Sequence, residues 1–213
     1  MTGADALRIE RSGRDFWSFA ARWSDPDGSI AGRYAPHLFF ADTGQEPFVL
    51  GLLHNESSLH AGTTKCSFLG ETPPTEDAPL GVGRCALYEG RPAACRVFPS
   101  KLDATRELVQ LEPLPTRGQI DDPNPIYSLC PTDWKPEHID PIETPGVIAA
   151  AEIEMEFFHK IARMWNRVAG PWEAFPKFLR LVYAGRVRVV EPVADPVVDE
   201  SDELVSVPFR RAA

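Results

Sequence analysis

The residues of this chain best suited to chemistry are its four cysteines, which all lie between positions 66 and 130. Two of them stand in one short segment, residues 84–99, which reads RCALYEGRPAACRVFP and also contains three arginines and two prolines. Four thiolates are enough to close a tetrahedral zinc site or to hold one four-iron cluster. This segment therefore indicates a metal site as the first hypothesis for function.

The spacing of the cysteines is unusual for either kind of site. Successive cysteines are separated by 18, 9 and 34 residues, whereas zinc knuckles and ferredoxin motifs contain closely spaced pairs. The surrounding charges are more informative, because four thiolates around Zn²⁺ or an oxidised cubane leave a net charge of about −2. Four basic residues close to the cysteines in sequence could compensate that charge: Lys65, Arg84, Arg91 and Arg96.

The cysteine motif resembles that of the YkgJ-type cysteine-cluster proteins, which are described as zinc- or iron-chelating domains. The resemblance covers Cys66-Ser67-Phe68-Leu69, then residues 85–99, and then Cys130-Pro131. It implies that the metal ligands are Cys66, Cys85, Cys95 and Cys130. It also implies that Arg91, Pro92 and Arg96 shape the loop, with both arginines beside the bound cofactor.

The resemblance implies a metal-binding protein with a structural or metal-handling site, which holds either a [4Fe–4S] cluster or Zn²⁺. One branch of the family resembles flagellin lysine N-methylases, which are thought to use an iron–sulfur cluster, and this favours iron–sulfur over zinc. That branch also implies an alternative function, a protein lysine N-methylase-like enzyme. A third alternative is a protein-interaction module with a structural zinc, in which an acidic tail or a proline-rich face docks the partner.

The residues alone are also consistent with cysteines that bind no metal. Reduced cysteine is often a buried core residue, and two disulfides would suit an oxidising compartment. Arg91 and Arg96 could equally form weak surface ion pairs with Glu89 and other acids, and His54 or His60 could replace one thiolate. Neither a Gly-x-Ser-x-Gly elbow nor a phosphate-binding glycine loop occurs in the sequence, so whether the protein is an enzyme stays open.

Charge and hydropathy narrow the choice of partner. A net charge of −9 disfavours binding to nucleic acid or anionic lipid. No uncharged apolar stretch approaches the roughly 20 residues that span a bilayer, and residues 1–15 lack the apolar core of a secretory signal. We therefore expect a cytoplasmic protein that binds neither nucleic acid nor membrane, in which reduced thiols are favoured over disulfides.

The elements that must position the cysteines are expected to be short, because the chain contains 21 prolines. We predict an α+β domain over residues 1–190, in which a small proline-rich layer of strands and loops surrounds the four-cysteine site and C-terminal helices pack on it. Residues 191–213 are predicted to be an acidic disordered tail.

Within the domain, the pattern of apolar residues, capping residues and prolines predicts individual elements. A helix is predicted to begin near Ser12–Asp15 and to end near Ser24, and a β-hairpin is predicted to pair residues 37–40 with 48–53. A loop over 71–83, a strand over 107–112 and a long loop over 113–143 that contains Cys130 follow. Two helices complete the prediction, one over 145–168 and one over 175–184. The apolar stripe of the first is predicted to consist of Val147, Ala151, Ile153, Phe157, Ile161, Met164, Trp165 and Val168.

Overall fold

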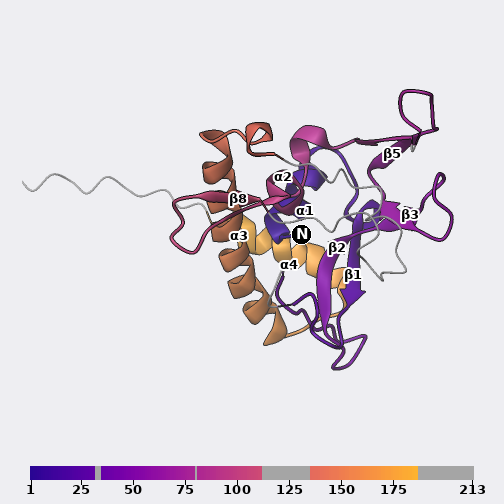
Figure 1. Ribbon diagram of the computed structural model, residues 1–213. Helices are drawn as coiled ribbons and strands as arrows, with labels where there is room; N and C mark the ends of the chain where they lie inside the picture. Colours follow the sequence, from indigo (N-terminus) through magenta and orange to yellow (C-terminus); the bar gives the residue numbers. More distant parts are fainter. Residues whose placement is uncertain (32–34, 80, 112–134, 187–213) are drawn as a thin grey trace, which may run out of the picture.

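The computed structural model describes residues 1–31, 35–79, 81–111 and 135–186. These residues form helices and four two-stranded antiparallel sheets, so the predicted α+β class is confirmed. In Figure 1 the longest helix lies on the left of the molecule and most of the small sheets lie on the right, with the C-terminal helix in the middle of the view. Cys130 and the predicted tail at 191–213 lie outside the described residues.

The strands pair in chain order, β1 with β2, β3 with β4, β5 with β6 and β7 with β8. Helix α1 packs against α4, and both α2 and β7 pack against α3. The elements are α1 (Gly3–Arg11), β1 (Ala20–Ser24), β2 (Phe48–Leu52), β3 (His54–Glu56), β4 (Thr64–Cys66), β5 (Leu69–Thr72), β6 (Val82–Cys85), α2 (Ala93–Val97), β7 (Ser100–Leu102), β8 (Val109–Leu111), α3 (Glu143–Asn166) and α4 (Phe175–Ala184).

The N-terminal segment differs from its prediction. The first helix is α1, which begins after a capping box formed by Thr2 and Asp5 and ends before Gly13, whose φ is +88°. The predicted helix from Ser12 to Ser24 is wrong. Asp15 instead caps a short 3₁₀ turn, and residues 20–24 form strand β1, because pairing with β2 along the whole strand outweighs the helical spacing of the apolar residues.

The predicted hairpin of residues 37–40 with 48–53 is also wrong, because the partner of β2 is β1. Residues 37–40 contribute one isolated bridge, in which the N–H groups of Leu38 and Phe48 each donate to the other's carbonyl at 2.8 and 2.9 Å. The end of α3 holds this segment instead: the indole N–H of Trp165 donates to the Phe39 carbonyl at 2.7 Å, and the Asn166 side chain bonds the backbone of residues 37 and 39.

The middle of the chain is more regular than predicted. The loop expected over 71–83 includes the ends of two strands, because β5 and β6 pair antiparallel from Leu69↔Cys85 to Thr72↔Val82. The predicted strand at 107–112 is confirmed as β8, which is shorter and pairs with β7.

Both C-terminal helices are confirmed. Helix α3 begins slightly earlier than predicted because the carboxylate of Asp140 accepts the N–H groups of residues 142 and 143. Its buried line was predicted only in part: Ile161 and Trp165 of the predicted stripe are buried, whereas Ile153, Met164 and Val168 are exposed. The buried side chains are Ile148, Phe158, Ile161, Ala162 and Trp165.

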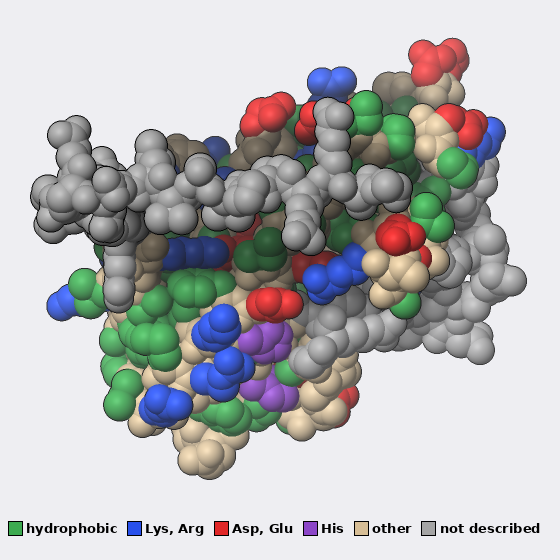
Figure 2. Space-filling model, turned by 90° about the vertical axis from the view of Figure 1, so that its left-hand side faces the viewer, with side chains coloured by type: hydrophobic (Ala, Val, Ile, Leu, Met, Phe, Trp, Pro, Cys, Tyr) green, Lys and Arg blue, Asp and Glu red, His purple; other side chains and the backbone are tan. Residues whose placement is uncertain are grey.

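The α3 side of the molecule presents a mixed surface. Figure 2 shows that apolar side chains gather there beside scattered basic ones. Ile153 and Met164 of α3 are exposed apolar residues. None of the described helices is both long enough and apolar enough to traverse a bilayer.

The core is dominated by aromatic rings around Phe40, which is fully buried. Its ring centroid lies 5.1 Å from that of Trp172, 5.6 Å from Phe175, 5.8 Å from Trp165 and 5.9 Å from Phe48. Such edge-on contacts are worth roughly 0.5–1.5 kcal/mol each beyond burial. Phe40 therefore joins β2 to the end of α3 and to α4.

We predict that Phe40→Ala lowers the free energy of unfolding by about 3–5 kcal/mol, because it leaves a cavity where several rings meet. Urea unfolding followed by tryptophan fluorescence measures the change. The neighbouring Phe39, which is only half-buried, supplies the control, and Phe39→Ala should cost clearly less. Equal costs for the two variants would contradict the central place of Phe40 in the core.

Candidate metal centre

Three of the four predicted ligands lie among the described residues, and each is a free thiol. Cys66 ends strand β4, Cys85 ends strand β6, and Cys95 lies in the short helix α2. Cys66 and Cys85 are half-buried against the hydrophobic core, whereas Cys95 is exposed. The described candidates thus come from three separate segments, and the fourth, Cys130, is outside the described part of the chain.

The strand register brings Cys66 and Cys85 close together. Cys85 pairs with Leu69, which follows Cys66 by three residues. The connecting turn is fixed where the Ala86 N–H donates to the Phe68 carbonyl at 2.8 Å and the Ser67 N–H donates to the Leu53 carbonyl at 2.9 Å. The local hydrogen bonding therefore holds both thiols at adjoining strand ends.

The backbone N–H groups of Phe68 and Leu69 lie near the Cys66 sulfur and lower the pKa of its thiol. Burial is the largest influence and raises the pKa of the Cys66 thiol, and the nearby charge of Cys85 raises it further, so that the net shift is upward. Backbone donors aimed at a cysteine sulfur stabilise a thiolate and are the outer hydrogen bonds that a thiolate-bound metal needs.

Cys95 belongs to the same electrostatic cluster. Desolvation by neighbouring atoms raises the pKa of its thiol most strongly, and the charges of Cys66 and Cys85 raise it further. The three thiols therefore interact with one another, although strands β4 and β6 and helix α2 are separate in sequence. Within the described ranges, however, no group of three or more His, Cys, Asp or Glu side chains is placed so that it could hold a metal ion.

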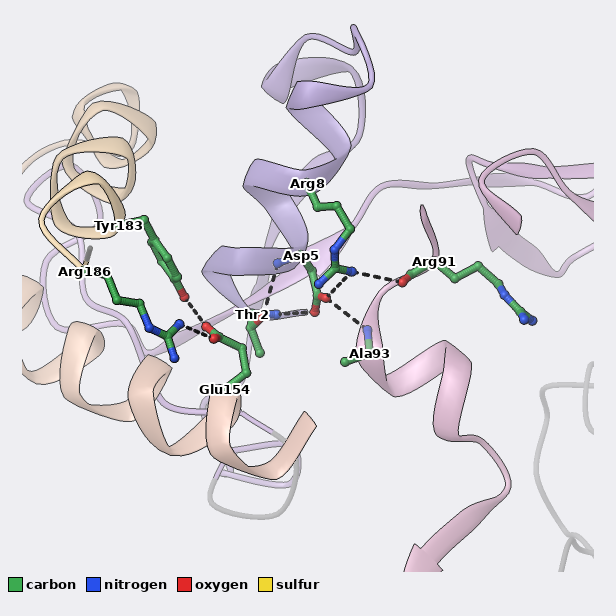
Figure 3. A network of polar contacts seen from close by, with 8 residues as sticks. All are labelled: Thr2, Asp5, Arg8, Arg91, Ala93, Glu154, Tyr183 and Arg186. Atoms are coloured by element: carbon green, nitrogen blue, oxygen red, sulfur yellow. Dashed lines mark hydrogen bonds and ion pairs between the residues drawn. The ribbon is translucent and has the colours of Figure 1, made fainter. Parts of the chain in front are cut away.

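Helix α2 is fastened to helix α1 by the carboxylate of Asp5, as Figure 3 shows. Its Oδ1 atom accepts the N–H of Ala93 at 3.0 Å and an N–H of Arg8 at 3.1 Å. The same Arg8 nitrogen donates to the carbonyl of Arg91 at 3.3 Å. Asp5 and Arg8 thus fix the Arg91-Pro92-Ala93 segment that leads into Cys95.

The basic residues that the sequence analysis placed near the cysteines differ in their surroundings. The guanidinium of Arg91 lies 4.2 Å from the Tyr88 ring centroid and donates to the Tyr88 carbonyl at 2.9 Å, and in Figure 3 it points away from Asp5. Arg96 is exposed in the last turn of α2. Lys65 pairs with Glu71 at 3.1 Å, so its charge is already partly compensated.

The sequence analysis missed two residues near the cysteines, Asp5 and Ser67. The Thr2-x-x-Asp5 pattern was a visible signal, because it matches a capping box, but the long-range bond from Ala93 to Asp5 has no local signature. The hydroxyl oxygen of Ser67 is buried and has no hydrogen-bond partner among the described residues. His54 stands opposite Cys66 in the β3–β4 register, which places both on one face of that sheet.

Comparison of the chain with protein-family models, with curated proteins and with solved structures gives no match. The resemblance of the cysteine motif to the YkgJ-type proteins therefore stays a hypothesis that rests on the motif itself.

We predict that Asp5→Ala lowers the free energy of unfolding by about 2–4 kcal/mol, because it removes a helix cap and leaves the buried N–H of Ala93 without its acceptor. Urea unfolding measures this effect. Asp15→Ala is the matched control, since Asp15 also caps a turn but is exposed, and it should cost about 1 kcal/mol or less. An Asp5→Ala variant no less stable than Asp15→Ala would refute the role of Asp5.

Proposed function

We propose that this chain is a metal-binding protein in which Cys66, Cys85, Cys95 and Cys130 jointly hold one [4Fe–4S] cluster, with Zn²⁺ as the alternative occupant. The observation that carries the proposal is that three thiols from three chain segments lie near one another, since the charge of Cys85 raises the pKa of Cys66 and the charges of both raise the pKa of Cys95. Two of these thiols are half-buried and the third is exposed, and a cation or cluster would give all three a common partner.

The donor set fits such a group chemically. Thiolates are soft ligands that select zinc and iron–sulfur clusters. The N–H groups of Phe68 and Leu69 lie near the Cys66 sulfur, where they lower the pKa of its thiol, and the Ser67 hydroxyl is a buried donor without a partner among the described residues. Hydrogen bonds to sulfur are the contacts that stabilise and tune a bound cluster.

A four-iron cluster can hold thiols that stand farther apart than those around a single zinc ion. A single zinc ion holds its sulfurs about 3.8 Å apart, given Zn–S bonds of about 2.3 Å in a tetrahedron. In a four-iron cluster each cysteine binds a different iron atom, so the sulfurs stand farther apart. The described thiols interact electrostatically, yet no group of three among the described residues is placed to hold one ion.

The ligand set also suggests what the site does. A [4Fe–4S] cluster supplies one-electron transfer and a rigid link between its ligands. If four cysteines fill the protein's share of the coordination, no position is left open for a substrate. We therefore propose a structural or metal-handling centre that ties β4, β6 and α2 together, so that loading with metal stabilises the fold.

We predict that Cys95→Ser loses most of the bound metal and lowers the thermal midpoint by several degrees, because one ligand and its link to α2 are removed. The measurements are elemental analysis and visible absorption of anaerobically purified protein, followed by thermal unfolding. Ala94→Ser is the matched control, since it places a serine at the adjacent exposed position of the same helix.

Wild-type protein and the Ala94→Ser variant should contain iron and sulfide and should show a broad visible absorption that dithionite bleaches. Stoichiometric zinc without colour would replace the cluster by Zn²⁺. Equal metal content and equal midpoints in Cys95→Ser and Ala94→Ser would remove Cys95 from the centre.

We also predict that Ser67→Ala reduces metal retention without weakening the metal-free fold. Removal of a buried hydroxyl that lacks a partner among the described residues relieves a desolvation cost, so the unfolding midpoint of the chelator-treated variant should equal or exceed that of the wild type. The readout is the rate of metal loss to a chelator, set beside urea unfolding of the metal-free proteins. Unchanged metal loss would show that the hydroxyl does not donate to the bound group.

A further inference from the structure

A cavity of about 540 Å³ lies between helices α1, α2 and α3 and strand β2. Its walls are mainly apolar and are formed by residues that include Leu50, Leu52, Val97, Ile148 and Met155. Small-molecule sites typically enclose about 300–1,000 Å³ and are lined in this way. The cavity thus has the size and chemistry of a ligand site.

One end of the cavity is aromatic. Trp23 and His54 both line it, and their rings meet edge to face at 4.6 Å between centroids. The indole N–H of Trp23 already donates to the Leu52 carbonyl at 3.1 Å. A molecule in the cavity would therefore meet these two rings, and the hydrogen-bonding capacity of the indole is used within the protein.

The charged side chains that border the cavity also have partners within the protein. Asp5 accepts three hydrogen bonds, from the N–H groups of Thr2 and Ala93 and from Arg8. Glu152 pairs with Arg106 at 3.3 Å, and Lys101 likewise has an interaction partner. The N-terminal ammonium of Met1, which also lines the cavity, donates to the Leu50 carbonyl at 3.1 Å. An uncharged ligand would replace water on the apolar walls without displacing any of these contacts.

We infer that this cavity binds an uncharged, apolar small molecule that packs against the side chain of Cys95. Cys95 lines the cavity and also belongs to the thiol cluster, so the bound molecule would touch one predicted ligand of the metal centre. The inference goes beyond the proposed function and does not depend on it, because the walls are formed by the protein alone.

The test uses N-phenyl-1-naphthylamine, an uncharged probe whose fluorescence increases in apolar surroundings, titrated into the full chain. Ala151 lines the cavity from α3, whereas the neighbouring Ala150 is exposed. We expect saturable binding to the wild type, at least an about tenfold higher Kd in Ala151→Trp, which fills the cavity, and a Kd within about twofold of the wild type in Ala150→Trp.

Circular dichroism and thermal unfolding establish that each variant is folded. If Ala151→Trp does not fold, the Kd of the probe is measured for Ala151→Leu instead, and the same increase is expected. Absence of saturable binding to the wild type, or equal Kd values in the Ala150 and Ala151 variants, would overturn the inference. Metal content is measured on the same samples, and the titration is repeated on metal-free protein. Binding that persists without metal supports the cavity even where the metal centre fails its own test.

Discussion

The carboxylate of Asp5 makes the contact on which the arrangement of the cysteine segment depends. It closes the capping box of α1 and, from the same buried position, accepts the N–H of Ala93 at the start of α2. An exposed cap stabilises only its own helix, but this one joins two helices through residues that lie 88 positions apart in sequence. Because α2 is only five residues long, its place is set by such tertiary contacts and not by helix propensity.

The second constraint is the packing that holds the ends of two short strands, those that carry Cys66 and Cys85, close together. Cys66 and Cys85 each end a strand of a different two-stranded sheet, and sheets of this size are weak by themselves. Their ends are held by packing on the aromatic core and by hydrogen bonds through the Ser67-Phe68 turn. A shared metal or cluster would link these strand ends to α2, which is the physical reason to expect that metal loading and stability are coupled. Cys95, which we propose as a ligand of this centre, also lines the adjoining apolar cavity.

The sequence predicted best where local signals were strong. Helices α3 and α4 carry long apolar patterns, and proline or glycine marks their ends, so both were found nearly complete. The N-terminal segment failed because Phe16, Phe19 and Ala20 recur at helical spacing, while the outcome was decided by pairing of residues 20–24 with β2. The hairpin predicted for residues 37–40 was also wrong because of a distant contact, since the side chains of Trp165 and Asn166 hydrogen-bond the backbone of this segment. The cysteine motif indicated the candidate metal ligands. Neither the hydrogen bond from the distant Ala93 to Asp5 nor the burial of the Ser67 hydroxyl is marked by a local sequence pattern.

The central claim is that the sulfurs of the four cysteines converge on one metal centre. X-ray absorption spectroscopy of the anaerobically purified full chain tests it most directly, because it identifies the metal and counts its neighbours. The account predicts an iron edge with four sulfur neighbours per iron and a further shell of iron. Zinc with four sulfur neighbours would retain the centre and replace the cluster. A metal coordinated only by oxygen and nitrogen, or protein without stoichiometric metal after anaerobic purification, would contradict the account.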